Sequence, residues 1–167
     1  MNTLLMSIHQ VWEGLEQGLL DRLAPLADLA ARLYIAKVFF ASGWNKVQDW
    51  ESTLYLFREE YHVPLLPPEL AAYLGTGGEL GLSVLLALGL WTRFSACGLF
   101  VLNIVAVVSY YDSLKDSPAA LQDHLQWGLL LSLLVVGTVK QLTVDHLLVR
   151  RFFTVIRVIV VLKSFCS

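Results

Sequence analysis

Four polar side chains lie near the centres of otherwise apolar segments of this sequence. They are Lys37, Glu79, Asn103 and Ser132, each in a different hydrophobic run. A charged side chain at the centre of a membrane helix costs about 2.5–3.5 kcal/mol on insertion scales, so it is expected to face protein rather than lipid. Lysine and glutamate can form an ion pair, and asparagine and serine both donate and accept hydrogen bonds. If the four side chains meet at one depth, they could bind a polar head group or transfer protons.

Glu79 is expected to face the interior of the protein and to have a basic or hydrogen-bonding partner. Arg32 and Lys37 lie five positions apart, about 140° around a helix, so they cannot both face it squarely. A purely structural role is equally open, because interhelical hydrogen bonds, which average about 0.6 kcal/mol, can simply hold helices together. The sequence leaves the partner open among five side chains, which complete the candidate ligand-binding set with Glu79: Arg32, Lys37, Lys46, Asn103 and Ser132.

A metal site, a thiol redox pair and a bound cofactor have weaker support from the sequence. His62 and His124 are weak candidates for a metal site, since zinc sites use three or four ligands. Cys97 and Cys166 are far apart and form no CxxC motif, which argues against a thiol redox pair. The sequence has no phosphate-binding loop, nucleophile elbow or zinc-protease helix, and we predict no intrinsic cofactor. No basic stripe is interleaved with aromatic residues, so we expect no nucleic-acid partner.

The elements that must position these residues are membrane helices. Hydrophobic residues make up 56% and charged residues 16% of the 167 residues, against about 45–50% and roughly 25% in soluble domains. About 20 apolar residues suffice to cross a bilayer. We therefore predict an all-α integral membrane protein that forms a four-helix bundle. Pro25 is expected to begin the first helix. An acidic, proline-containing loop at 48–68 is expected to contain a short helix near 53–61. The four predicted spans cover residues 26–47, 70–90, 94–111 and 124–142.

Amphipathic segments are expected at both ends of the bundle, which gives three parts. Residues 1–24 have helical spacing of apolar residues with a polar reverse face, as in a helix lying in the membrane interface. Residues 25–142 form the bundle. Residues 143–167 are expected to form a basic amphipathic tail on an anionic leaflet, and a fifth, tilted span over 152–162 is the alternative that the sequence leaves open.

The distribution of Lys and Arg predicts the orientation, because cytoplasmic loops carry an excess of both. Three of these residues, Lys46, Arg58 and Lys115, fall on one side of the predicted spans. Both termini and the other side are then cytoplasmic, in an inner (plasma) membrane. The residues on that side are Arg22, Arg93, Lys140, Arg150, Arg151, Arg157 and Lys163.

Two short motifs point to a family. Arg32-Leu33 followed by Gly43-Trp44-Asn45-Lys46 resembles the first-helix pattern of the DoxX family, and Gly78-Glu79-Leu80-Gly81, with Leu88-Gly89 and Arg93 after it, resembles the second helix and its turn. The resemblance covers roughly residues 30–142. It implies a small bacterial inner-membrane four-helix bundle. Some relatives are the membrane subunit of thiosulfate:quinone oxidoreductase, and others associate with oxidative-stress enzymes.

The fourth predicted span adds a finer resemblance. Asp123-His124, Trp127 and then Asp145-His146-Leu147-Leu148 are similar to the branch called HvfX, which is associated with the maturation of copper-binding modified peptides. The resemblance thus implies an accessory subunit of a redox or metal-stress system. A quinone or a partner protein would supply any redox chemistry.

Two other functions are alternatives to an accessory subunit of a redox or metal-stress system. The main alternative is a non-enzymatic membrane anchor or assembly partner. A small-solute carrier is less favoured, because four short spans leave little room for two alternating halves. Besides the lipid bilayer, a partner protein is expected, and homo-oligomerisation is left open.

Overall fold

The computed structural model describes Gly14, Gly18 and residues 21–137 of the chain. In this part all regular secondary structure is helical, and no strand occurs. The predicted amphipathic ends lie outside it, except for Gly14, Gly18 and the beginning of the first long helix. The helices are α2 (Asp21–Gln48), α3 (Trp50–Glu59), α4 (Pro68–Leu88), α5 (Thr92–Ser109), α6 (Tyr111–Leu114) and α7 (Pro118–Gly137).

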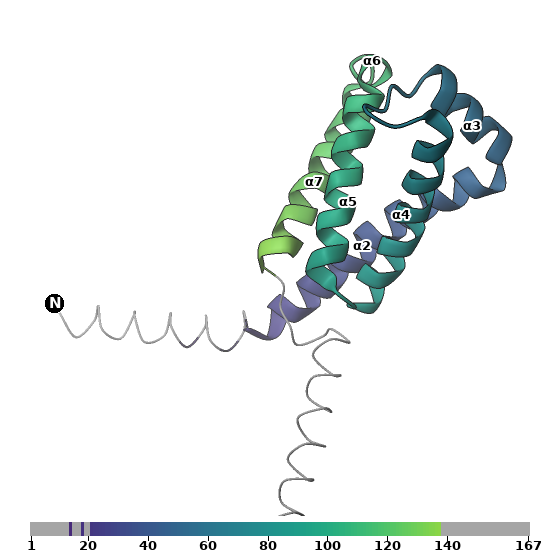
Figure 1. The fold of residues 1–167 in the computed structure, drawn as a ribbon. Helices are drawn as coiled ribbons and strands as arrows, with labels where there is room; N and C mark the ends of the chain where they lie inside the picture. The colour runs from purple at the N-terminus through teal and green to yellow at the C-terminus, as the bar shows by residue number, and fades with distance from the viewer. Residues whose placement is uncertain (1–13, 15–17, 19–20, 138–167) are drawn as a thin grey trace, which may run out of the picture.

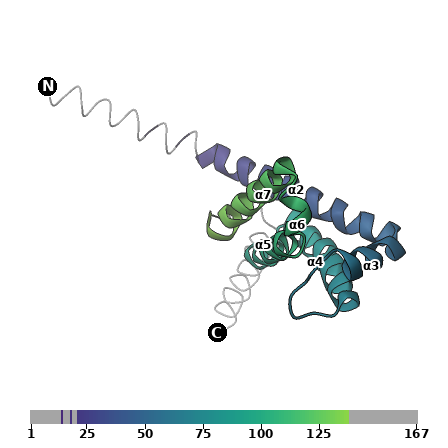
Figure 2. The ribbon, with the colours of Figure 1, turned by 90° about the horizontal axis from the view of Figure 1, so that it is seen from above.

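The four long helices α2, α4, α5 and α7 run along one another (Figure 1). Helix α2 packs on α4, α4 on α5, and α5 on α7, while α2 also contacts α7. The short helices α3 and α6 lie at the same end of the long helices, where α3 packs on α4 and α6 contacts α5 and α7, and the α4–α5 turn lies at the other end. Viewed from above, in Figure 2, α3 extends to one side of the long helices.

Three of these helices, α4, α5 and α7, are long and apolar enough to cross a membrane. Helix α2 is not among them, although it has 28 residues. Its charged residues are the physical reason, because Asp28, Arg32, Lys37 and Lys46 leave no long uncharged stretch. The predicted span over 26–47 is therefore present as a helix and is not shown as a membrane span.

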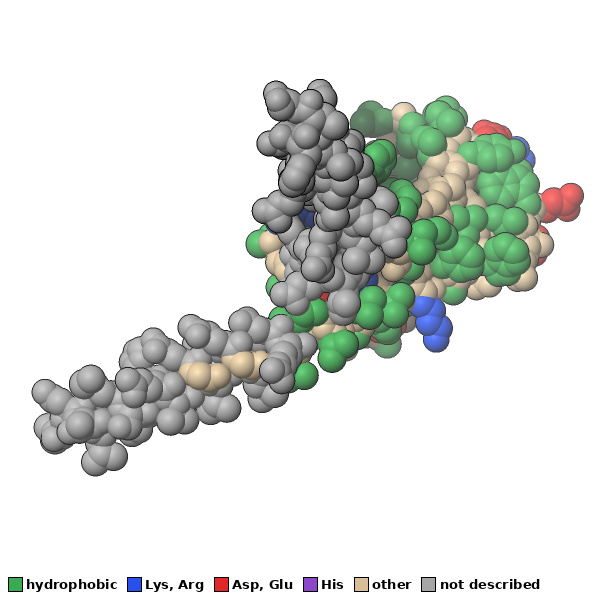
Figure 3. All heavy atoms as spheres, turned by 90° about the horizontal axis from the view of Figure 1, so that it is seen from below, with side chains coloured by type: hydrophobic (Ala, Val, Ile, Leu, Met, Phe, Trp, Pro, Cys, Tyr) green, Lys and Arg blue, Asp and Glu red, His purple; other side chains and the backbone are tan. Residues whose placement is uncertain are grey.

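The surface of the helices is apolar over wide areas, as Figure 3 shows. On α7, exposed apolar side chains recur every three or four residues, at Leu125, Leu129, Leu133 and Val136. That spacing forms a stripe along one helix face. Lipid is the environment in which such a stripe is stable, because water disfavours large exposed apolar patches.

The predicted boundaries hold to within two residues for α4 and α5, and the predicted short helix near 53–61 is found as α3. The boundary of α7 is wrong, because the helix begins at Pro118 and not at residue 124. Proline is favoured in the first turn of a helix, and the backbone N–H of Leu121 donates to the Ser117 carbonyl. Pro25 is also placed differently, since it lies inside α2 and does not begin it.

Close approach of α2 to α4 depends on Gly43. A Cβ at this position would lie 2.9 Å from Leu80 Cγ and 3.1 Å from Glu79 Cβ, closer than side chains tolerate. Glycine therefore lets the backbone of α2 reach α4 at the level of Glu79. Glycine also allows close packing between α4 and α5, where a Cβ at Gly98 would lie 2.6 Å from Leu82 Cδ1.

Candidate functional site

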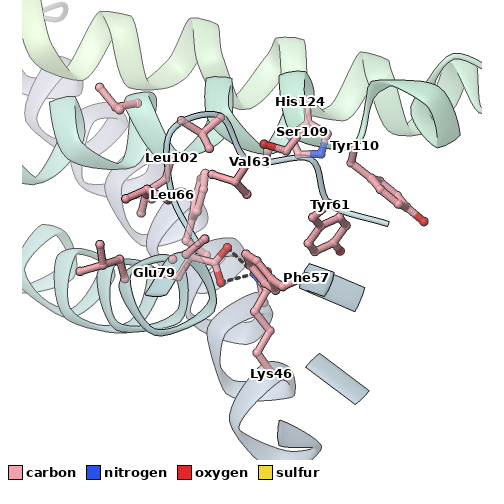
Figure 4. Close-up of a pocket in the computed structure, with 18 of the residues that line it drawn as sticks. Lys46, Phe57, Tyr61, Val63, Leu66, Glu79, Leu102, Ser109, Tyr110 and His124 are labelled. Carbon is pink, nitrogen blue, oxygen red and sulfur yellow. Dashed lines mark hydrogen bonds and ion pairs between the residues drawn. The ribbon is translucent and has the colours of Figure 1, made fainter. Parts of the chain in front are cut away.

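A cavity of about 510 Å³ lies between the long helices, at the end covered by α3 and the loop before α4. This volume is within the range of about 300–1,000 Å³ that is usual for small-molecule sites. Its walls are mostly apolar, and Figure 4 shows Val63, Leu66 and Leu102 between its polar side chains. The side chains with polar groups that line it come from every long helix and from the segments that connect them: Ser42, Lys46, Tyr61, Glu79, Ser109, Tyr110, His124 and Trp127.

The ion pair between Lys46 and Glu79 forms one wall of the cavity (Figure 4). Lys46 Nζ lies 2.5 and 2.6 Å from the two carboxylate oxygens of Glu79, and it donates to Ser42 Oγ at 3.2 Å. The Lys46 side chain is 20% exposed and that of Glu79 is 12% exposed. Glu79 therefore faces the interior, and its partner is the cation in the last turn of α2.

The other two cations of α2 lie elsewhere. Arg32 is fully buried, and its Nε donates to Asp28 Oδ2 at 2.9 Å. Lys37, which was expected in the polar group at mid-depth, is exposed and lines neither this cavity nor its neighbour. Nine positions separate Lys37 from Lys46, about two and a half helical turns, so the two side chains point to opposite sides of α2.

Asn103 and His124 form a second polar pair, between α5 and α7. Asn103 Nδ2 donates to the backbone carbonyl of His124 at 2.9 Å, and His124 Nδ1 lies 2.7 Å from Asn103 Oδ1. Gly128 leaves room for this contact, because a Cβ there would lie 3.3 Å from Asn103 Nδ2. Asn103 is 4% exposed, and its buried amide finds its hydrogen-bond partners on the neighbouring helix.

The polar side chains expected at one depth are therefore divided between two cavities. Asn103 and Ser132 line a second cavity of about 350 Å³ between α5 and α7. Ser132 Oγ donates to the Gly128 carbonyl at 2.8 Å. Glu79 and Lys46 line the larger cavity, and His124 lines both.

The two histidines named as metal candidates have different surroundings. His62 lies exposed in the loop before α4, with Nδ1 3.1 Å from the Glu60 carbonyl, while His124 is held by Asn103. Among residues 21–137, no three His, Cys, Asp or Glu side chains gather closely enough to hold a metal ion.

Aromatic rings close the end of the cavity near α3 and α6. The Tyr61 ring contacts those of Phe57 and Tyr110 edge-on, with centroids 4.8 and 4.9 Å apart. The loop is fastened to α5 by the backbone N–H of His62, which donates to the Ser109 carbonyl at 3.1 Å. Burial of the Tyr61 phenol raises its pKa above the usual value, and the neighbouring Tyr110, Glu60 and Glu79 add to this. Tyr61 is therefore a neutral hydroxyl at physiological pH.

Sequence reasoning missed this aromatic group and Ser109. Tyr61 and Tyr110 lie at predicted helix ends, where aromatic residues usually face the membrane interface. Only the pairing of the loop with the end of α5 turns them inward, and no local pattern reveals that pairing.

The sequence model of the DoxX family matches residues 27–112, slightly more than half of the chain. The chain belongs to the DoxX family. The matched region contains both partners of the Lys46–Glu79 pair and ends before α7, so it does not include His124. This match supports no assignment to the HvfX branch. Neither the curated proteins nor the solved structures contain a match to this chain.

Proposed function

We propose that this DoxX-family membrane protein binds the head group of an amphipathic, lipid-soluble molecule of the quinone class, as an accessory subunit of a redox or metal-stress system. The observation that carries the proposal is the mainly apolar cavity of about 510 Å³ with the Lys46–Glu79 ion pair in its wall. An apolar site with a few convergent polar groups is the usual form of a small-molecule site.

The residues present fit a quinone head group chemically. The Lys46 ammonium has three N–H donors, which reach both carboxylate oxygens of Glu79 and Ser42 Oγ, and a ligand carbonyl can replace one of these acceptors. Glu79 can accept from a ligand hydroxyl. The apolar side chains Val63, Leu66 and Leu102 suit the ring and its tail. When bound, a quinone would supply electron-carrying chemistry, and the chain's own residues bind it, orient it and keep water away.

The proposal includes a fourth span formed by α2. A helix of 28 residues is roughly 42 Å long, more than the hydrocarbon core of a bilayer. Two of its cations are paired, Arg32 with Asp28 and Lys46 with Glu79, which lowers the cost of placing them in the membrane. Four spans put both termini on the same side of a bacterial inner membrane, and the excess of Lys and Arg makes that side cytoplasmic. The cavity then lies near the outer leaflet.

A binding experiment tests the proposal. The full chain in lipid nanodiscs is titrated with decylubiquinone, and binding is followed by quenching of tryptophan fluorescence. The double substitution Lys46→Gln and Glu79→Gln removes both charges without leaving one buried and unpaired. We expect it to weaken binding about tenfold or more, the loss of a hydrogen bond to a charged group.

The matched control removes another ion pair between neighbouring helices. Arg58 and Glu69 join α3 to α4 on the surface, where their side chains are 53% and 50% exposed. Arg58→Gln with Glu69→Gln should leave binding unchanged. A wild-type protein without saturable binding, or equal affinity in both double variants, would contradict the proposal; the first result would favour an anchor or assembly role.

A further inference from the structure

The large cavity has a second polar wall, opposite the ion pair. Figure 4 shows His124 and Ser109 on one side of the cavity, and Lys46 with Glu79 across from them. His124 comes from α7 and Ser109 from the end of α5, and both line the cavity. This wall is not part of the charge pair on which the proposed function rests.

The hydrogen bonds of Asn103 fix the tautomer of His124. The backbone carbonyl of His124 can only accept, so the Asn103 group that faces it is the NH₂ group. The other end of the same amide is then an acceptor, and it lies 2.7 Å from His124 Nδ1. His124 Nδ1 must carry the hydrogen. In the neutral ring, Nε2 is therefore left as a hydrogen-bond acceptor.

This acceptor has no hydrogen-bond partner within residues 21–137, whereas Nδ1 is held by Asn103. Ser109 gives an independent indication that the wall is incomplete. Its residue is only 6% exposed, and its Oγ has no partner in the described part of the chain. A buried polar group without a partner is costly, so such groups mark places that a ligand or water completes.

We propose that this wall binds a hydroxyl group of the ligand, with His124 Nε2 accepting its hydrogen. The inference rests on the proposed function, because it assumes that the large cavity is a ligand site. A carbonyl or ether oxygen only accepts hydrogen bonds and leaves Nε2 unsatisfied. A hydroxyl donates to Nε2 and can also accept from the Ser109 hydroxyl. This wall therefore favours hydroxyl-bearing amphiphiles, such as phenols with an apolar tail, over their ether counterparts.

The test compares two probes that differ only in the donor. The full chain in nanodiscs is titrated with 4-octylphenol and with its methyl ether, 4-octylanisole, by isothermal titration calorimetry. We expect the phenol to bind about tenfold more tightly than the ether. His124→Phe should reduce the affinity for the phenol to that for the ether and leave the ether unchanged. His124→Gln, which retains a carbonyl acceptor, should keep part of the preference.

His62→Phe is the matched control, because His62 is exposed in the loop and lines neither cavity. It should bind both probes as the wild type does. If both probes and decylubiquinone bind but the wild type does not prefer the phenol, the inference fails and the ligand cavity stands. A preference that survives in His124→Phe also overturns it. If nothing binds, the inference and the proposed function fail together.

Discussion

Mutation can remove the two charges of the buried Lys46–Glu79 ion pair one at a time or together. Removing one partner of a buried pair leaves an uncompensated charge, which costs about 3–5 kcal/mol, whereas replacing both by apolar residues is often neutral. We expect Lys46→Met alone to lower the free energy of unfolding strongly. Adding Glu79→Leu should restore most of the loss.

Unfolding in SDS, followed by circular dichroism, measures these changes. Arg58→Met, in the exposed pair with Glu69, is the control and should change stability by less than about 1 kcal/mol. If Lys46→Met is as mild as the control, then the pair is not buried in the membrane-embedded protein.

Tyr61 gives a dependence of stability on pH. Burial raises the pKa of its phenol in the folded protein, so the unfolded state loses the proton first as pH rises. The resulting contribution to stability is complete below the ordinary pKa of 10.0 and is lost as pH rises through the higher folded value. Tyr61→Phe should therefore lose less stability than the wild type between neutral pH and about pH 11.

Thermal unfolding at a series of pH values measures this difference. Tyr55→Phe is the control, because Tyr55 is 63% exposed. The effects of Tyr61→Phe and Tyr55→Phe on the pH dependence of stability should differ only at alkaline pH. An identical pH profile for Tyr61→Phe and the wild type would show that the phenol is in contact with water.

At the scale of helices, the contact between α2 and α4 is the one that sets the position of Glu79. Gly43 allows it, since a Cβ would lie 2.9 Å from Leu80 Cγ. We expect Gly43→Ala to destabilise the protein by about 1–3 kcal/mol through overpacking, even though alanine favours helix.

Gly81→Ala is the matched control on α4, where a Cβ would meet nothing within 4 Å. It should be neutral or stabilise by up to about 1 kcal/mol. Equal effects of the two substitutions on the unfolding midpoint would mean that α2 does not approach α4 as described.

Hydrophobic runs predicted the helices better than their ends. The apolar stretches located α4 and α5 because a membrane helix must be apolar for most of its length. They missed the start of α7, since Pro118 and its neighbours are set by turn chemistry and not by hydropathy. They also predicted a span over 26–47 although it carries Arg32 and Lys37, and α2 is not among the helices apolar enough to cross a membrane.

The site was harder to predict than the helices. Glu79 was expected to have a partner among five side chains, because a buried carboxylate needs one. That the partner is Lys46, and not Lys37, depends on the rotation and tilt of α2 relative to α4. His124 was considered as a metal ligand and as part of a family resemblance, and not as a partner of Asn103, since that contact depends on the packing of α5 against α7.

At the scale of the whole molecule, the proposed topology makes a prediction about α2. If α2 spans the membrane and both termini are cytoplasmic, then α3 and the loop before α4 lie on the outer side. A cysteine at Glu51, which is exposed in the first turn of α3, should react with a membrane-impermeant maleimide in intact cells, in a chain with Cys97 and Cys166 replaced by serine. A cysteine at Leu23, which is exposed at the opposite end of α2, should react only after the cells are permeabilised. The reverse pattern would mean the opposite orientation, and reaction of both in intact cells would mean that α2 does not span.

The most direct test of the central claim is to find where a quinone lies on the protein. The full chain in native membranes is labelled with an azido-quinone under light, with and without excess decylubiquinone, and the labelled peptides are mapped by mass spectrometry. The account predicts saturable labelling at cavity residues of α4, α5 and the loop before α4, such as Leu66, Glu79 and Leu102, and loss of that labelling when Lys46 and Glu79 are both glutamine. Labelling that is not displaced and that falls on the exposed stripe of α7, at Leu125, Leu129 and Leu133, would show a quinone dissolved in lipid and would contradict the claim that the cavity is a binding site.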